Sequence, residues 1–195
     1  MTLKDIVSTA FSDLSLALTL ASQRRDLLIE TGSRLADRLT KGGTIFICGN
    51  GGSASMSSHL ATELVSRFLI ERPGLPAKAL TADTATLTAI GNDYSFAEVF
   101  SRQVRALGRP GDVLWGLSTS GTSPNVLKAL AEANSREMLT LFMCGPKVHD
   151  PKVADIIIPT PGATTPRIQE IQLLYGHTLC HIVESLIFEG GSKDD

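Results

Sequence analysis

Two short polar segments combine residue types that suit the binding of an anion. Residues 48–53 read CGNGGS and residues 118–123 read STSGTS, and each segment directly follows an apolar run. A loop that ends a strand and begins a helix exposes free backbone N–H groups and the positive end of the helix dipole. Both segments contain glycine and hydroxyl side chains, and neither contains lysine. They therefore indicate a sugar phosphate held by neutral donors, and not the triphosphate of a nucleotide.

In the second segment, glycine and proline complement the hydroxyl groups. The hydroxyl donors are Ser118, Thr119, Ser120 and Ser123. Gly121 would let the backbone close around an oxyanion. A polar turn with a helix cap is the alternative, because Ser123 before Pro124 suits an N-cap followed by proline at the first helical position. Capping does not exclude phosphate binding.

His59 and Glu63 follow the first segment and stand four residues apart. On a helix this spacing puts both side chains on one face, about one turn from each other. Such a pair suits a metal ion and equally suits acid–base chemistry, whereas an exposed pair that only supports the helix is the alternative. A phosphate bound at the first segment would leave the far end of a small sugar about one to two helical turns away, near this face.

The last predicted helix carries a second polar set inside an apolar pattern. Its members are Arg167, Gln169, Glu170, Gln172, His177 and His181. A single histidine on such a helix is more often structural than functional. Gln169 and His177 are eight residues apart, an axial rise of about 12 Å. In a straight helix both could reach one ion only with extended side chains, so either the helix bends or the ligands come from two subunits.

Hydrophobic patterning predicts the elements that would position these residues. Residues 3–38 have helical spacing, as one helix or a helical hairpin. Strands are expected at 44–48, 77–80, 113–117, 139–143 and 154–159, and further helices at 53–69, 96–107, 123–136 and 165–188. Asn92 and Asp93 follow Gly91 and most simply form a turn, with binding of a sugar-ring hydroxyl as the alternative.

This order of elements predicts an α/β fold in a single domain over residues 1–195. Its parts are N-terminal helices at about 3–40 and an α/β core at about 44–188. Apolar strands that alternate with helices imply a parallel sheet covered on both faces. Ligands of such sheets bind beyond the carboxyl ends of the strands, where the strand order reverses.

Composition excludes several classes of partner. The chain has 195 residues, 43% of them hydrophobic, and a net charge of -2, so it lacks the basic surface of a protein that binds nucleic acid or an anionic membrane. Three cysteines without CxxC spacing argue against a disulfide framework and a cysteine zinc site, and indicate a reducing cytoplasm. No signal pattern is present, and no apolar run reaches the roughly 18 to 20 residues that span a bilayer.

An ordered series of motifs resembles the phosphoheptose isomerase family, which has the sugar isomerase (SIS) fold. The series consists of GNGGS at 49–53, His59 with Glu63, RF at 67–68 with ERP at 71–73, GND at 91–93, GDVL at 111–114, STSG at 118–121 and RIQE at 167–170. The resemblance covers nearly the whole chain, and the ordered series is far more specific than any one motif. It implies a three-layer parallel-sheet sandwich of the SIS type.

The resemblance also implies an activity and a set of site residues. The activity is the conversion of sedoheptulose 7-phosphate to D-glycero-D-manno-heptose 7-phosphate, in ADP-heptose and lipopolysaccharide core biosynthesis, by a cytoplasmic homotetramer with active sites between subunits. One zinc ion per subunit is implied, with ligands at His59, Glu63, Gln169 and His177. Implied substrate contacts are Asn50, Gly51, Gly52, Ser53, Glu63, Asn92, Asp93, Ser118, Thr119, Ser120, Ser123 and Gln169.

For this activity we expect isomerisation through an enediol. Glu63 would remove the proton from C1 of the ketose and return it at C2, and His177 would move protons between O1 and O2. The metal or the neutral donors would stabilise the enediolate oxygen. A carboxylate bound to zinc is a poorer base, so the two roles of Glu63 compete.

The chain departs from the family pattern at three positions that bear on the ligand or the metal. Met56 stands where many members have aspartate, Pro166 where alanine or aspartate is common, and Gln172 where histidine is common. Two alternative functions remain. One is a non-catalytic SIS protein that binds the bacterial replication initiator, although such relatives lack the full set of site residues; the other is an isomerase of a different phosphosugar.

Overall fold

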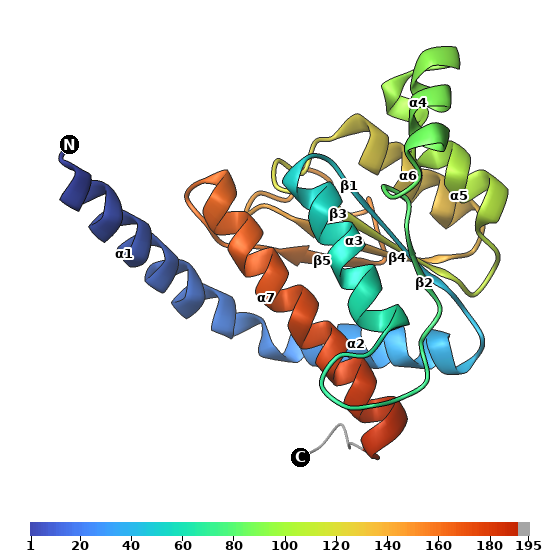
Figure 1. The fold of residues 1–195 in the computed structure, drawn as a ribbon, viewed down its shortest axis with the longest axis horizontal. Helices are drawn as coiled ribbons and strands as arrows, with labels where there is room; N and C mark the ends of the chain where they lie inside the picture. The colour runs from blue at the N-terminus through green and yellow to red at the C-terminus, as the bar shows by residue number, and fades with distance from the viewer. Residues whose placement is uncertain (191–195) are drawn as a thin grey trace.

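A parallel sheet of five strands forms the centre of the fold, as the alternation of apolar strands and helices predicts (Figure 1). The computed structural model describes residues 1–190, so the last part of the predicted domain, residues 191–195, lies outside the described residues. The strands are β1 (Ile45–Gly49), β2 (Ala77–Ala79), β3 (Val113–Ser118), β4 (Leu139–Cys144) and β5 (Ile156–Pro159). All neighbouring strands run parallel, in the order β2-β1-β3-β4-β5.

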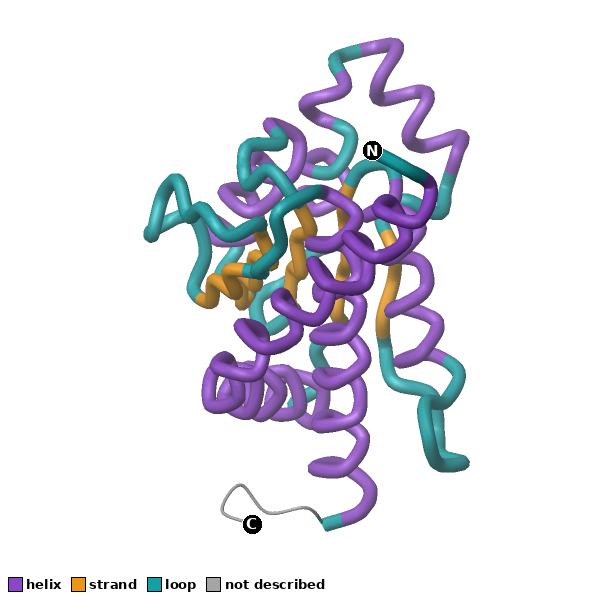
Figure 2. Tube along the Cα trace, turned by 90° about the vertical axis from the view of Figure 1, so that its left-hand side faces the viewer, coloured by secondary structure: helices purple, strands orange, loops and turns teal. Residues whose placement is uncertain are grey.

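Helices cover both faces of this sheet, which confirms the predicted three-layer α/β architecture (Figures 1 and 2). One face carries α2 (Arg25–Thr40), α3 (Gly52–Val65) and α7 (Thr165–Glu184), and the other carries α5 (Ser101–Leu107) and α6 (Pro124–Ser135). The remaining helical segments are α1 (Leu3–Ala21), η1 (Ser22–Arg24), α4 (Thr84–Asp93), η2 (Phe96–Glu98) and η3 (Ser185–Glu189).

Each face of the sheet has its own hydrophobic core, because successive side chains of a strand point to opposite faces. Trp115 of β3 is fully buried in the core formed with α2, α3 and α7. Its neighbour Leu114 is fully buried in the core formed with α5 and α6. Burial on both faces explains why the central strands consist mainly of apolar residues.

The strand order reverses between β1 and β3. From β1 the chain passes to β2 on one side of the sheet and then returns to β3 on the other side. Gly49 at the end of β1 is in register with Leu117 near the end of β3. The two polar segments of the sequence therefore begin side by side at the carboxyl edge of the sheet, where ligands of such sheets bind.

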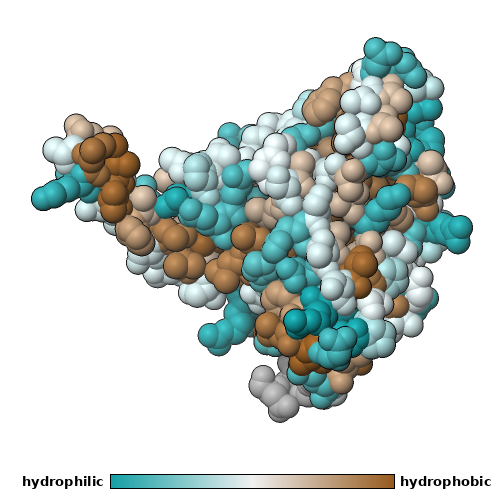
Figure 3. Space-filling view, in the orientation of Figure 1, coloured by the Kyte–Doolittle hydropathy of each residue, from teal (hydrophilic) through white to brown (hydrophobic). Residues whose placement is uncertain are grey.

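The N-terminal helices form a bent rod. Helix α1 and helix α2 are joined by the 3-10 turn η1 without a reversal of direction (Figure 1), so of the two predicted forms the hairpin is wrong. Helix α2 packs against α7, whereas the first part of α1 projects away from the other elements. Figure 3 shows apolar side chains along this projecting helix, and Leu3 and Phe11 are 82% and 73% exposed.

Helix α3 ends at Val65, four residues before the predicted end at Leu69. The physical reason is a buried carboxylate from another helix. The backbone N–H groups of Phe68, Leu69 and Ile70 donate to Glu184, so they are not available for the hydrogen bonds of a continued helix.

The region from 81 to 107 also differs from the predicted pattern. Asn92 and Asp93 form the last turn of helix α4 and not a loop turn, because Asp83 caps this helix by accepting the Thr86 N–H and a single glycine does not stop it. The helix predicted at 96–107 is divided into η2 and α5.

Helix α7 together with η3, from Thr165 to Glu189, is long and apolar enough to cross a membrane by length and composition, with a mean hydropathy of 1.2. Polar residues interrupt its apolar pattern, so the sequence has no uninterrupted apolar run at this helix. Of the 18-residue stretch of this helix that meets the criterion, 44% is buried inside the fold. Helix α7 packs against α2 and α3. Its composition is that of a helix that forms part of a protein core.

Candidate functional site

His59, Glu63 and His177 come together where α3 faces α7, and we call them the His–Glu–His cluster. His59 Nε2 lies 2.8 Å from His177 Nε2 and 3.4 Å from Glu63 Oε1, which confirms the shared helix face predicted for His59 and Glu63. One ligand atom from each of the three residues lies within 4.8 Å of the others. Imidazole nitrogens and carboxylate oxygens are the usual nitrogen and oxygen ligands of zinc in proteins, so the cluster could hold a metal ion.

Gly176 allows α7 to approach α3 closely enough to form this cluster. A Cβ atom on Gly176 would lie only 2.6 Å from Leu60 Cδ2, whereas non-bonded carbon atoms prefer separations of about 3.5–4.0 Å. Because Gly176 has no side chain, the next residue, His177, reaches His59 across the helix interface.

The electrostatic setting of the cluster favours a neutral His177. Burial lowers the pKa of His177 below its ordinary value of 6.5, and the neighbouring His59 lowers it further, while Glu63 acts in the opposite direction. A neutral imidazole has a free lone pair for a metal ion or a proton. The Glu63 side chain is 22% exposed, so it remains accessible from solvent.

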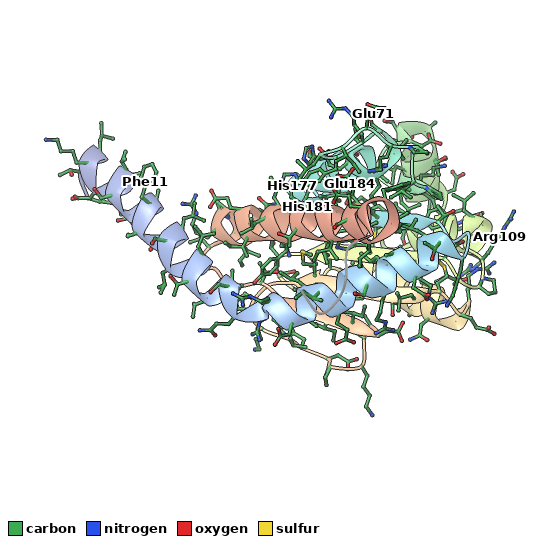
Figure 4. The ribbon with its side chains drawn as sticks, turned by 90° about the horizontal axis from the view of Figure 1, so that it is seen from below. Phe11, Glu71, Arg109, His177, His181 and Glu184 are labelled. Atoms are coloured by element: carbon green, nitrogen blue, oxygen red, sulfur yellow. The ribbon has the colours of Figure 1, made fainter. Side chains whose placement is uncertain are left out.

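Phe68 forms an aromatic wall beside the cluster. Its ring centroid lies 5.7 Å from that of His177 and 6.2 Å from that of His181, and Figure 4 shows both histidines on the same side of α7. The helical pattern continued α3 through Phe68 and therefore did not predict this contact. It arises because the chain leaves α3 before Phe68.

A cavity of about 420 Å³ lies beside the cluster, between the first halves of α3 and α7. The residues around it are Gly52, Ser55, Met56, His59, Pro166, Gln169, Glu170 and Leu173. His59 lines the cavity and is also a member of the His–Glu–His cluster. A small molecule in the cavity would therefore lie next to the cluster.

Gln169 faces the same cavity but lies near a different part of α3 from His177. Its Nε2 is 2.6 Å from the position that a Cβ atom on Gly52 would occupy. His177 instead contacts His59, which lies about two helical turns after Gly52 on α3. The spacing problem noted in the sequence is therefore visible in the fold, and the role of Gln169 as a fourth metal ligand stays a prediction.

The three departures from the family pattern fall into two groups. Met56 and Pro166 line the cavity, so they can affect what it accepts. Gln172 is fully buried, and its Nε2 donates to the Met143 carbonyl at 3.0 Å. Gln172 therefore belongs to the contact between α7 and the sheet.

The hydroxyl groups of residues 118–123, the hydroxyl loop, converge as the sequence predicts. Ser118 Oγ lies 2.9 Å from Ser123 Oγ and 3.3 Å from Ser120 Oγ. Gly121 has a φ of +72°, a conformation that glycine adopts readily, and its N–H donates to Ser118 Oγ. Ser123 has the predicted N-cap position before Pro124, but its hydroxyl contacts Ser118 and does not cap the helix.

A pair of side-chain amides links residues 49–53, the glycine loop, to helix α6, which begins directly after the hydroxyl loop. Asn50 and Asn125 each donate from Nδ2 to the other's Oδ1 at 2.8 Å. Asn125 is the second residue of α6 and was not among the predicted site residues. The signal that could have identified it is an asparagine directly after the Ser-Pro start of a helix. Ser53 is buried at the start of α3, and its N–H donates to the Asn50 carbonyl.

The connection between β4 and β5 packs against the hydroxyl loop. A Cβ atom on Gly145 would clash with the Thr119 carbonyl oxygen, and one on Gly121 would lie 3.3 Å from His149 Cδ2. The imidazole of His149 thus lies beside the hydroxyl loop. Its position results from the packing of two loops that no local sequence pattern links.

Asn92 and Asp93 lie apart from these residues. They end helix α4, which packs against η2 and buries none of its own residues, and Asn92 Nδ2 donates to Asp93 Oδ1. Within one chain the fold thus brings together the two loops, the His–Glu–His cluster and Gln169. A contact of Asn92 or Asp93 with substrate stays a prediction.

Comparison with known proteins gives consistent matches. A family model described as the SIS domain matches residues 14–144. A phosphoheptose isomerase of Maridesulfovibrio salexigens is 47% identical over 188 residues, which are 96% of this chain and 92% of that protein. Among solved structures, the phosphoheptose isomerase of Neisseria gonorrhoeae is 38% identical with a TM-score of 0.87, over 94% of this chain and 100% of that one. That of Francisella tularensis is 34% identical with a TM-score of 0.90, over 95% and 100%.

Proposed function

The chain belongs to the SIS-domain family and, within it, to the phosphoheptose isomerases, and from this premise we propose that it converts sedoheptulose 7-phosphate to D-glycero-D-manno-heptose 7-phosphate. The observation that carries the proposal is the combination of a neutral hydroxyl loop at the carboxyl edge of the sheet and a His–Glu–His cluster whose helix α3 begins at the same edge. The product is a precursor of ADP-heptose, and we assign the enzyme to the supply of heptose for the lipopolysaccharide core.

The hydroxyl loop is the proposed phosphate site. Its serine hydroxyls converge, and they stand at the amino-terminal end of α6, whose dipole favours an anion. The two loops begin next to each other on β1 and β3. A sugar held by its phosphate at the hydroxyl loop can therefore extend past the glycine loop toward α3.

The His–Glu–His cluster fits a zinc ion. Two imidazole nitrogens and a carboxylate oxygen approach one another closely enough, and the lowered pKa of His177 keeps it in the neutral form that a metal requires. We propose His59, Glu63 and His177 as ligands, with Gln169 as the fourth. A bound zinc ion would act as a Lewis acid that stabilises negative charge on the sugar oxygens.

Glu63 and His177 are the proposed catalytic residues. Glu63 removes a proton from C1 of the ketose, which gives the enediol, and returns a proton to C2. His177 accepts the proton of the O1 hydroxyl and donates a proton to O2, so the carbonyl moves from C2 to C1 without net change in protons. A neutral imidazole has one free lone pair, so His177 can accept the O1 proton only while that lone pair does not hold the ion, and the competition between the two roles of Glu63 extends to His177.

A homotetramer is the proposed assembly, with active sites between subunits. Apolar side chains are exposed along α1, among them Leu3, Phe11 and Leu16, and a cavity of about 410 Å³ with mainly apolar lining lies between α1, α2 and α7. A projecting apolar helix in a second copy of this chain is a chemical match for such a groove. A neighbouring subunit could also supply polar groups, such as Asn92, that lie away from the site within one chain.

We place the enzyme in the cytoplasm, which accords with its three unpaired cysteines.

The direct test is turnover of sedoheptulose 7-phosphate by the purified protein, followed by product analysis, with and without a strong zinc chelator. We expect isomerisation that the chelator abolishes and added Zn²⁺ restores. Turnover that resists complete metal removal would contradict the metal assignment. Failure to convert this sugar, with conversion of another phosphosugar, would replace the substrate, and failure with all phosphosugars would favour a non-catalytic SIS protein.

A further inference from the structure

We propose that Arg72 and Glu184 are positioning residues that hold Glu63 of α3 and His177 of α7 at the distance the reaction needs. The inference rests on the proposed function and deepens it, because it identifies the hydrogen-bond network that keeps the two helices of the site in register. The side chains of Arg72 and Glu184 bind main-chain groups of α3 and of the segment after it, and not the imidazole or carboxylate groups of the cluster. Their action is through the main chain of α3 and the segment that follows it.

Arg72 and Glu184 form a fully buried ion pair. Arg72 Nε lies 2.8 Å from Glu184 Oε1, and both side chains are 1% exposed. The pair joins two separate parts of the fold, because Arg72 follows α3 whereas Glu184 is the last residue of α7. An ion pair in this position connects the two helices that carry the His–Glu–His cluster.

On the α3 side, Arg72 binds the final turn of the helix. Its Nη2 donates to the Glu63 carbonyl at 2.8 Å, and its Nη1 donates to the Leu64 carbonyl at 2.9 Å. These carbonyls lie at a helix end, where the last four have no partner within the helix. The guanidinium therefore fixes the main chain of Glu63 directly, and with it the starting point of the Glu63 side chain.

On the α7 side, Glu184 binds the segment that leaves α3. Its carboxylate accepts the N–H groups of Phe68 at 3.1 Å, Leu69 at 2.8 Å and Ile70 at 3.3 Å. Phe68 in turn packs its ring against His177. Glu184 stands seven residues after His177, about two helical turns, and Figure 4 shows His177, His181 and Glu184 along α7.

The energetics of buried ion pairs favour a positioning role over a purely stabilising one. Loss of solvation offsets most of the attraction between two buried charges, and well-packed apolar residues often stabilise a core as well or better. The pair does provide something that apolar residues cannot, namely directed bonds to the carbonyls of Glu63 and Leu64 and to three successive N–H groups. These bonds fix position and orientation.

The test uses Glu184→Gln and Arg72→Lys, with three measurements on each: Zn²⁺ affinity by competition with a chromophoric chelator, kcat, and inhibition by inorganic phosphate. We expect Zn²⁺ affinity and kcat to fall at least tenfold, while the phosphate inhibition constant changes less than twofold. Arg72→Lys keeps the charge but loses the fork that reaches two carbonyls. It therefore tests the proposal even if Glu184→Gln does not fold.

Asp112→Asn is the matched control. Asp112 is a buried carboxylate that accepts the N–H groups of Thr44 and Arg109 at 2.8 Å, and it lies just before β3, at the opposite end of the strand from the site. This acid-to-amide change should lower stability and leave Zn²⁺ affinity and kcat unchanged.

Two results would overturn the positioning role. One is wild-type Zn²⁺ affinity and kcat in both variants; the other is a parallel loss of Zn²⁺ affinity, kcat and phosphate inhibition, which would indicate general damage. A wild-type protein without isomerase activity would instead contradict the proposed function, and Zn²⁺ affinity would still decide the positioning role. If the wild type isomerises but binds no Zn²⁺, a loss of kcat in the variants without a change in the phosphate inhibition constant would support the positioning role, and any other pattern would overturn it.

Discussion

The hydroxyl loop at the carboxyl edge of the sheet and the His–Glu–His cluster between two helices on one face of that sheet are built in opposite ways. The hydroxyl loop consists of consecutive residues without any ionisable side chain. The cluster consists of three ionisable side chains within 4.8 Å, and its two histidines are separated by 118 positions in the chain. The first is local and neutral, and the second is non-local and titratable.

Under the proposed function, this difference separates substrate binding from the chemical step. A turn of consecutive residues can present hydrogen-bond donors to a phosphate if the strand before it and the helix after it form. It does not depend on how distant helices pack. The cluster exists only if α3 and α7 pack at the observed distance. Changes at the loop should therefore alter substrate affinity, whereas changes at the helix contact should alter turnover.

Glu63→Gln should give the largest effect. It removes the proposed base but keeps the size of the side chain, so we expect kcat to fall about 10²- to 10⁴-fold, the usual contribution of a general base. Exchange of the substrate C1 hydrogen with solvent, followed by NMR in deuterium oxide, measures the step directly. The KM should stay within a few-fold because the phosphate site is untouched. Exchange at the wild-type rate in this variant would eliminate Glu63 as the base.

Ser120→Ala should produce the complementary result. Ser120 is exposed in the hydroxyl loop and contacts Ser118 Oγ at 3.3 Å. Hydrogen bonds to charged groups contribute about 1.5–3 kcal/mol, so we expect KM and the phosphate inhibition constant to rise about tenfold or more. Steady-state kinetics should show kcat unchanged within a few-fold. A loss confined to kcat would contradict the separation of the two regions.

Gly176→Ala tests the helix contact through packing alone. The added methyl group would meet Leu60, and overpacking of a core typically costs about 1–3 kcal/mol. We expect a lower free energy of unfolding in urea and weaker Zn²⁺ binding, because α7 must move away from α3. The double variant with Leu60→Ala provides the control, since the extra space should restore Zn²⁺ affinity. Weak binding that persists in the double variant would point to a cause other than helix spacing.

The pH dependence of stability should give the smallest effect, and of the two regions only the cluster should contribute to it. Burial lowers the folded-state pKa of His177 below the ordinary value of 6.5, so the unfolded chain binds more protons between these two pKa values. The contribution is therefore complete above about pH 6.5 and is lost as the pH falls toward the folded-state pKa. Urea unfolding of the metal-free protein between pH 5 and 8 measures it. His177→Gln should reduce the slope, and an unchanged slope would show that other groups cause it.

Sequence patterns predicted the parts of the site that depend on local order. The glycine loop, the hydroxyl loop and the His59–Glu63 pair follow from residues a few positions apart, and turns and helix faces are determined at that range. All five strands were predicted to within two residues at each end, and the three central strands β1, β3 and β4 are uniformly buried, which gives them a continuous apolar pattern.

The parts that depend on packing between distant segments could not be predicted in the same way. The end of α3 is set by Glu184, more than one hundred residues later, and helical periodicity of residues 53–69 has no information about it. Asn125 and Phe68 have the same explanation, because each gains its role from a partner on another element. The sequence contains these contacts, but only the assembled fold shows which residues meet.

The 2.8 Å contact between the two Nε2 atoms of His59 and His177 has a thermodynamic consequence for the loading of the site. A hydrogen bond between two imidazole nitrogens contains one proton, and a metal ion needs the lone pairs of both nitrogens. That proton would therefore have to leave Nε2, and a neutral imidazole can carry it on Nδ1 instead, so an ion could bind without net release of this proton. Loading of the proposed site would then be a change of tautomer at one histidine, and the hydrogen-bond partner available to that Nδ1 would contribute to the affinity for the metal.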